Sequence, residues 1–231
     1  MATVSERAPG MVDNVAAIGE GTRPTAGIPL RVVDGRRLER KMRDVLKPGG
    51  VIPDAHGHAH ALPRFFYEVP SWDVAVKLQL SEHFALWEFI HTDVHEAEAL
   101  QTFPRYVPCA ITLLALSLEQ FRGAVGEYVH VAANGGYRSP THAMTLHATP
   151  HAWGSAVNIY KIGNTMLDER DVVEHYAEIA YKSMPGVYVR PFGNTQGFTD
   201  DHLHLDFGYV IAIPRDAPFE TYNPKVDVEP L

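Results

Sequence analysis

The sequence predicts an α+β fold, with a small and mostly antiparallel sheet flanked by helices. Apolar residues recur at helical spacing in 108–121 and again in 168–184, which predicts two core helices. Short β-like runs, separated by turns rich in Gly, Asn and Asp, predict the strands. These runs are 128–133, 155–161, 187–192 and 203–213.

The 231 residues can bury one sizeable core, and we divide the chain into three parts. Residues 1–50 are an N-terminal arm with a short helix, 51–213 a single domain, and 214–231 a C-terminal tail. Within the arm, 1–27 lacks periodicity and is expected to be either a mobile arm or an extended wrap. Basic and apolar residues in 36–46 predict a short amphipathic helix, which a Pro-Gly-Gly sequence then ends.

The charge and apolar pattern exclude several classes of partner. A formal net charge of -8 disfavours binding to nucleic acid or to anionic lipid. No apolar signal region and no run of about 20 apolar residues is present, so we expect neither export nor a membrane partner. The expected location is the cytoplasm, although a phage lysis protein would have the same pattern. The single cysteine, Cys109, lies in a predicted helix and is expected to be a buried spectator.

Alternating histidines mark the segment 54–60, which reads DAHGHAH. If this segment is extended, His56, His58 and His60 share one side. One interpretation is a polar loop. The other is a second metal site, or a lid over a first one.

A first candidate site segment is 149–159, with the sequence TPHAWGSAVNI. His151 ends a histidine-containing loop, and Asn158 follows seven residues later in a predicted strand. Gly154 allows tight passage of the backbone between them. This arrangement can aim both side chains at one point.

A second candidate segment is 201–206, with the sequence DHLHLD. A metal ligand at His204 would be held by a rigid strand, while Asp201 and His202 approach from the adjoining loop. Rigid ligands beside an open coordination position are typical of catalytic metal sites.

Taken together, these segments resemble the zinc D-Ala-D-Ala carboxypeptidase family, which includes phage L-alanyl-D-glutamate endopeptidases and, more distantly, the Hedgehog signalling domain. The resemblance lies in 149–159 followed by His204, in LSEHFALWEF at 80–89 and in GYRSP at 136–140. It covers about 80–209. It implies a Hedgehog/D-Ala-D-Ala peptidase-like fold and a metallopeptidase-like domain.

The resemblance also implies a ligand set for one divalent metal. His151 and His204 match metal ligands of the family, and Asn158 stands where the family has an Asp ligand. Asp201 matches the acidic residue that activates the metal-bound water. Zinc is the expected ion, with iron or copper as alternatives.

Further residues take substrate roles by the same resemblance. Arg138 matches an arginine that holds a substrate carbonyl or carboxylate, and it would share the developing oxyanion charge with the ion. His202 would add a hydrogen bond to that oxygen. Ser139, Tyr137 and Trp153 are the other expected substrate contacts, with a place in the core or the pocket wall as the alternative for Trp153.

Asn158 is the main departure from the family pattern. An amide oxygen is a neutral and weaker donor than a carboxylate, so weaker metal binding is expected. Three interpretations stay open: a weakened zinc hydrolase, an iron or copper oxygenase-type enzyme, and a scaffold that only binds. The predicted function is metal-dependent hydrolysis of a peptide or amide bond in a small peptide-like or D-amino-acid-containing substrate. The sequence predicts no oligomeric state.

Overall fold

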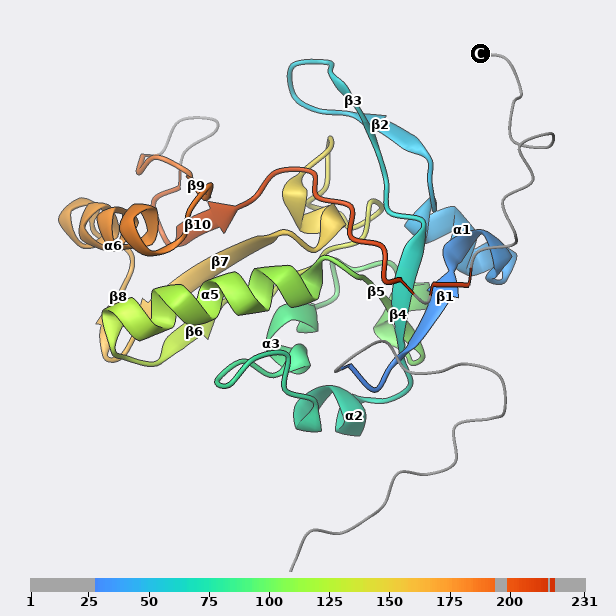
Figure 1. Cartoon of the computed structure of the whole chain (residues 1–231). Helices are drawn as coiled ribbons and strands as arrows, with labels where there is room; N and C mark the ends of the chain where they lie inside the picture. The colour runs from blue at the N-terminus through green and yellow to red at the C-terminus, as the bar shows by residue number, and fades with distance from the viewer. Residues whose placement is uncertain (1–27, 194–198, 216, 219–231) are drawn as a thin grey trace, which may run out of the picture.

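A computed structural model describes residues 28–193, 199–215 and 217–218 of the chain (Figure 1). Within them, helices surround small antiparallel sheets, which confirms the α+β class. The sheets have three, five and two strands, rather than forming the one small sheet that the sequence predicted. No helix in this described part is long and apolar enough to cross a membrane.

The five-stranded sheet carries the candidate site residues. Its strands are β6 (Val129–Val131), β7 (Ala156–Ile162), β10 (Leu203–Asp206) and β9 (Tyr188–Val189) in that order, with β8 (Thr165–Met166) paired to β7.

Two helices cover one face of this sheet, α5 (Ile111–Val125) and α6 (Arg170–Ser183) (Figure 1). Alternate residues of a strand point to opposite faces. Buried Val157 and Leu205 are cross-strand partners on the helix-covered face. Asn158 and His204, also partners, therefore lie on the other face.

The three-stranded sheet has the order β1-β4-β5, formed by β1 (Arg31–Asp34), β4 (Phe65–Val69) and β5 (Arg105–Pro108). A separate hairpin, β2 (Val51–Pro53) and β3 (Ala59–Ala61), projects from the body (Figure 1). The remaining elements are η1 (Gly35–Arg37), α1 (Arg40–Leu46), α2 (Trp72–Lys77), α3 (Leu86–Ile90), α4 (Glu98–Gln101) and η2 (Pro150–Trp153).

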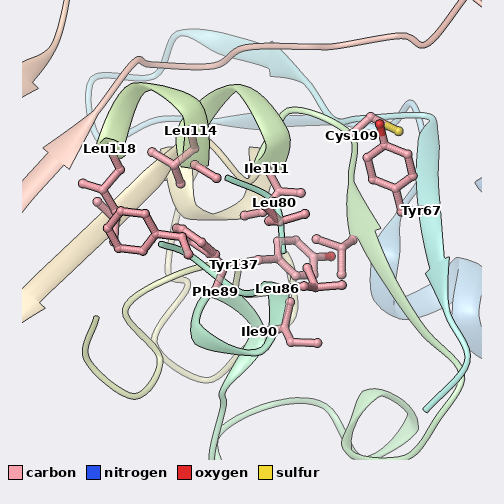
Figure 2. Close-up of a cluster of buried hydrophobic side chains, with 14 of the residues drawn as sticks. Tyr67, Leu80, Leu86, Phe89, Ile90, Cys109, Ile111, Leu114, Leu118 and Tyr137 are labelled. Atoms are coloured by element: carbon pink, nitrogen blue, oxygen red, sulfur yellow. The ribbon is translucent and has the colours of Figure 1, made fainter. Parts of the chain in front are cut away.

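Helix α5 provides the central ridge of the main core. Figure 2 shows Ile111, Leu114 and Leu118 directed toward Phe89 of α3 and toward Tyr137. The three α5 side chains and Phe89 are at most 1% exposed. Burying each side chain of this kind stabilises the fold by about 1.5–3 kcal/mol. The core therefore anchors the segment that leads into the candidate site.

Element boundaries shift from those predicted. The helix predicted at 108–121 runs over 111–125, because Pro108 ends β5, and buried Cys109 precedes the helix. The helix predicted at 168–184 is confirmed over 170–183. The strand predicted at 203–213 ends at Asp206, where Gly208 turns the chain with a φ of 70°.

The arm predicted at 1–50 is wrong for the residues that the structure describes. Strand β1 pairs with β4, and Leu30, Met42 and Leu46 belong to the main core because their apolar side chains are buried there. The helix predicted at 36–46 begins only at Arg40, after the 3-10 turn that Asp34 caps. Residues 1–27 and most of the tail at 214–231 lie outside the described residues.

Candidate metal centre

Three predicted ligands come together on the face of the five-stranded sheet opposite α5 and α6. His204 on β10 lies opposite Asn158 on β7, with His204 Nδ1 2.8 Å from Asn158 Oδ1. His151 enters from η2, which Gly154 ends in the left-handed conformation with a φ of 68°. The rings of His151 and His204 have centroids 5.2 Å apart. The structure thus brings the two imidazoles and the amide to one place.

Asp206 and Asn158, the hydrogen-bond neighbours of His204, determine which ring nitrogen carries the proton. Its Nε2 lies 2.8 Å from Asp206 Oδ2, and burial lowers the pKa of the imidazole to about 4. The neutral ring has a single N–H, which Nε2 donates to the carboxylate. Nδ1 therefore presents a lone pair toward Asn158. Either the Asn158 amide donates to Nδ1, or its oxygen and Nδ1 both face a bound cation.

His151 has the same kind of support. Its Nδ1 is 2.8 Å from the carbonyl oxygen of Gly136, to which it donates its proton. Burial, and then the charge of Arg138, hold its pKa well below the usual value. In the described part of the chain, His151 Nε2 has no hydrogen-bond partner. Metal-ligating histidines commonly donate their second nitrogen to a carbonyl or carboxylate, as both rings do here.

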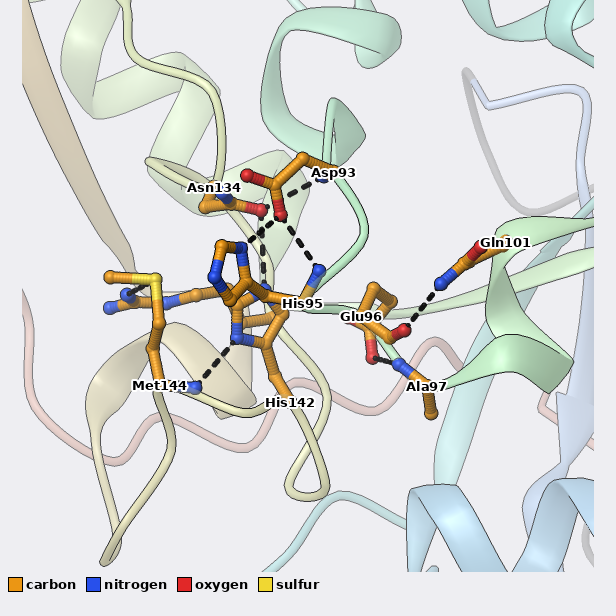
Figure 3. A network of polar contacts seen from close by, with 9 residues as sticks. Asp93, His95, Glu96, Ala97, Gln101, Asn134, His142 and Met144 are labelled. Atoms are coloured by element: carbon orange, nitrogen blue, oxygen red, sulfur yellow. Dashed lines mark hydrogen bonds and ion pairs between the residues drawn. The ribbon is translucent and has the colours of Figure 1, made fainter.

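A polar network fixes the loop that supplies the Gly136 carbonyl (Figure 3). Asn134 Oδ1 accepts from the Asp93 backbone N–H at 3.1 Å and lies 3.2 Å from His142 Nε2. Since His142 Nδ1 accepts from the Met144 N–H at 3.1 Å, its Nε2 is the donor to Asn134. The network ties both ends of the loop to the segment after α3.

Glu96 anchors the same loop from inside the protein. Its carboxylate accepts from Ser139 Oγ at 2.6 Å and from the Ser139 backbone N–H at 3.0 Å. Gly136 lies against α3 so closely that an added Cβ would meet the Phe89 carbonyl oxygen at 2.2 Å. Any side chain at this position would displace the carbonyl that orients His151.

Two arginines make the site electropositive. Arg138 is 8% exposed, its Nε has no hydrogen-bond partner among the described residues, and its Nη1 contacts Met144 Sδ at 3.9 Å. Burial and the charge of Arg190 lower the pKa of Arg138 to about 10. Arg190 follows β9, and its backbone N–H donates to His204 O at 3.1 Å. Among the described residues, neither guanidinium forms an ion pair, so the site favours an anionic group.

His202 and Asp201 form a pair at the start of β10. Asp201 Oδ1 is 2.5 Å from His202 Nδ1, and the Asp201 side chain is 78% exposed. His202 shares the face opposite α5 and α6 with His204, two residues on, and its Nε2 is buried without a partner among the described residues. Burial lowers the pKa of His202, against the opposing effect of Asp201. In this arrangement, Asp201 contacts His202 and acts on the site only through that ring.

Three expected substrate contacts are buried and contradict that role. Trp153 is 0% exposed and donates from Nε1 to the Ala61 carbonyl at 2.9 Å. Ser139 is 0% exposed and bonded to Glu96, while Tyr137 lies in the core shown in Figure 2. Each supports the loop from within, because its side chain is used for packing or internal hydrogen bonding.

Several residues of the site were not predicted. Asp206 lies two residues beyond His204, so strand alternation was a signal that both share a face. Arg190, Glu96 and the Gly136 carbonyl come from other elements and gave no local signal. Their roles depend on tertiary contacts alone.

A different group of side chains lies close enough together to hold a cation. The candidate ligand atoms of Glu82, His83 and Glu119 lie within 4.8 Å of one another. Burial raises the Glu119 pKa, but hydrogen bonds from His83 and Ser81 outweigh it and lower the pKa. These bonds fasten the loop before α3 to α5, which gives Glu119 a structural role without a metal.

Comparisons of this chain with models of protein families, with curated proteins and with solved structures found no match. The resemblance to the zinc D-Ala-D-Ala carboxypeptidase family therefore depends on the segments 80–89, 136–140 and 149–159 together with His204, and the description of the site depends on its own geometry.

Proposed function

We propose that this chain is a metal-dependent hydrolase of peptide or amide bonds, on a Hedgehog/D-Ala-D-Ala peptidase-like fold. One observation carries the proposal. Two buried, neutral imidazoles, His151 and His204, lie side by side with one nitrogen each hydrogen-bonded to an acceptor. The nitrogens left over, His151 Nε2 and His204 Nδ1, are suited to bind one divalent ion together with Asn158.

The ligand chemistry fits zinc and also iron or copper. Imidazole suits all three metals, and a neutral amide oxygen completes the set without adding negative charge. Once bound, a divalent ion would act as a Lewis acid and make a coordinated water easier to deprotonate. We expect weaker binding than a carboxylate at residue 158 would give. Replacing Asn158 with Asp should therefore increase zinc affinity.

His202 is the proposed proton acceptor. Its Nε2 is buried, unpartnered in the described part of the chain and on the same strand face as His204. Asp201 accepts the Nδ1 proton and so keeps the Nε2 lone pair free. This assignment exchanges the roles that the sequence analysis expected. Asp201 is a positioning residue here, and His202 moves the proton.

Arg138 and Arg190 are the proposed anion-binding groups. Both charges affect the nearby imidazoles, and Arg138 is buried with no ion-pair partner among the described residues. Burying an unpaired guanidinium costs free energy, and a substrate carboxylate or a developing oxyanion beside Arg138 would offset that cost. We therefore propose a small peptide-like substrate with a free carboxylate near the bond that is cleaved. D-amino acids are included in that class.

The test begins with metal-stripped full-length protein, reloaded with zinc, manganese, iron or copper in separate samples. Each sample is incubated with short L- and D-peptides, in free-acid and amidated forms, and cleavage is followed by mass spectrometry. We expect cleavage that requires the metal and prefers the free acids. No cleavage at any loading would reject hydrolysis, and oxygen uptake with iron or copper would favour the oxygenase interpretation.

Two variants sharpen the test. Arg190→Gln should raise KM for free acids more than for amides, while Arg170→Gln, exposed on α6, should change neither. His202→Gln should lower kcat about a hundredfold or more while leaving metal binding intact. If His202→Gln leaves kcat unchanged, the proton has another acceptor.

A further inference from the structure

The β2–β3 hairpin projects from the body of the protein (Figure 1). It carries one carboxylate, Asp54, and the imidazoles of His56, His58 and His60. Asp54 Oδ1 accepts from the backbone N–H of His56 at 2.8 Å and of His58 at 2.9 Å. These bonds fix the carboxylate at the turn. Its other oxygen, Oδ2, lies 3.0 Å from His60 Nε2 and 3.4 Å from His58 Nδ1.

His60 is also held from the side of the protein body. Its ring stacks on Tyr209, with centroids 3.5 Å apart and planes at 22°. Trp153 lies edge-on to His60 at 6.3 Å. The His60 side chain is 22% exposed, whereas that of His58 is 75% exposed. One imidazole is therefore preset, and the other is free to rotate.

We propose that Asp54, His58 and His60 form a second metal site, selective for divalent transition metals. Ligand atoms about 2.0–2.2 Å from one ion lie roughly 3.0–3.4 Å from each other. The separations of Asp54 Oδ2 from the two ring nitrogens, 3.0 and 3.4 Å, already match this spacing. The three ligand atoms do not all lie within 4.8 Å of one another in the structure, so the proposal requires the exposed His58 ring to rotate toward His60 when the ion binds.

The donor set determines which metals bind. Two imidazoles and one carboxylate favour copper, nickel and zinc over magnesium and calcium, with copper the tightest. The ring of His56 lies 6.2 Å from that of His58, near enough to supply a fourth ligand after rotation. Because the site is exposed and made of one hairpin, we expect affinity in the micromolar range for zinc.

The hairpin site is separate from the sheet site in its ligands. Two hydrogen bonds join the hairpin to the loop that carries His151: the Ala148 N–H donates to Pro53 O at 2.7 Å, and the Trp153 side chain donates from Nε1 to Ala61 O at 2.9 Å. The proposal does not rest on hydrolysis, since its ligands take no part in the proposed reaction. Absence of hydrolysis would leave the hairpin prediction unchanged.

The experiment is calorimetric titration of metal-free full-length protein with zinc chloride, repeated with copper sulfate. We expect two binding events in the wild type, and loss of one in the double variant His58→Gln/His60→Gln. The matched control, His175→Gln, replaces an exposed histidine of α6 and should retain both events. None of the three histidines belongs to the main core, although His60 stacks on Tyr209, and an unchanged circular dichroism spectrum checks that the fold is kept.

Two results would overturn the hairpin site. One is a double variant that keeps every binding event of the wild type at unchanged affinity. The other is loss of the second event in Glu82→Gln, which would place the ion at the Glu82, His83 and Glu119 group instead. A hairpin event that persists in His151→Gln, with the sheet event gone, would support two independent sites.

Discussion

The sheet site and the hairpin tip use the same imidazole chemistry in opposite settings. His151 and His204 are at most 1% exposed, and each donates one N–H to a fixed acceptor. On the hairpin, His58 keeps a side chain that is 75% exposed and shares one carboxylate with His60. Burial thus fixes ring orientation and the neutral state, whereas exposure leaves the ring free to adapt.

This difference in burial explains why only the sheet site needs supporting hydrogen bonds from the surrounding structure. A buried polar nitrogen without a partner is costly, so the sheet site requires the Gly136 carbonyl and the Asp206 carboxylate. The hairpin requires only the turn that Asp54 stabilises. Preorganised ligands suit catalysis, because they keep a reactive geometry without further ordering.

The largest contrast is expected from glycine substitutions in the two regions. Gly136→Ala would put its Cβ 2.2 Å from the Phe89 carbonyl, which should lower the free energy of unfolding by about 3 kcal/mol or more. Gly57→Ala, at the hairpin tip, meets nothing within 4 Å and has only the strain of a φ of 86°. We expect Gly57→Ala to lower the free energy of unfolding by about 1 kcal/mol. Urea denaturation measures both, and equal losses would contradict the comparison.

Removing one imidazole of the sheet site should have the second-largest effect. His151→Gln is expected to weaken zinc binding at the sheet site more than a hundredfold, about 3 kcal/mol, because the ring nitrogen is lost. His175→Gln is the control, since this histidine is exposed on α6. Calorimetry on metal-free protein gives the affinities. A sheet-site affinity within threefold of the wild type would exclude His151 as a ligand.

A smaller effect is expected when only the support of a ligand changes. Asp206→Asn keeps the size of the side chain but removes the charge that accepts from His204 Nε2 at 2.8 Å. Such changes typically cost about 10- to 100-fold in metal affinity. The hairpin event should be unaffected in the same titration. An equal loss at both events would mean that the two sites are not independent.

The attachment of the hairpin to the body should depend on pH. Arg64, which follows β3, donates from Nη2 to the buried Asp34 carboxylate at 2.6 Å. Burial raises the pKa of Asp34, but the hydrogen bonds and charges of Arg64 and Arg36 outweigh it, and the folded pKa is lowered. The stabilisation is therefore present above the unfolded pKa of about 3.9 and is lost as pH falls through the folded pKa.

Asp34→Asn tests this dependence. It should lower the free energy of unfolding by about 2 kcal/mol at pH 7, and the difference from the wild type should shrink below about pH 4. The control is Asp73→Asn, because the pair of Asp73 with Lys77 is about three-quarters exposed and should contribute little. A pH-independent loss in Asp34→Asn would rule out the ion pair as its cause.

The sequence predicted the parts of the fold that have regular periodicity. Helices α5 and α6 and strand β7 were located, as were the two segments that bring His151 and His204 together. Strand β1 was missed, because it has four residues and its pairing with β4 spans a long stretch of chain. Local pattern cannot reveal a partner that distant.

The chemistry around the ligands was harder to predict than the ligands themselves. Arg190 and Glu96 reach the site only through the tertiary fold, and no motif marks them. Trp153 was expected either as a substrate contact or as part of the core or pocket wall, and its buried ring agrees with the second interpretation. Proximity along the chain does not determine which face a loop residue takes.

The most direct test is an anomalous difference map from crystals of zinc-loaded protein, measured on both sides of the zinc absorption edge. We predict a peak bounded by His151 Nε2, His204 Nδ1 and Asn158 Oδ1, with the Asn158 oxygen turned toward the ion. A map with no peak at this position, and with the Asn158 amide nitrogen donating to His204, would contradict the proposed metal centre.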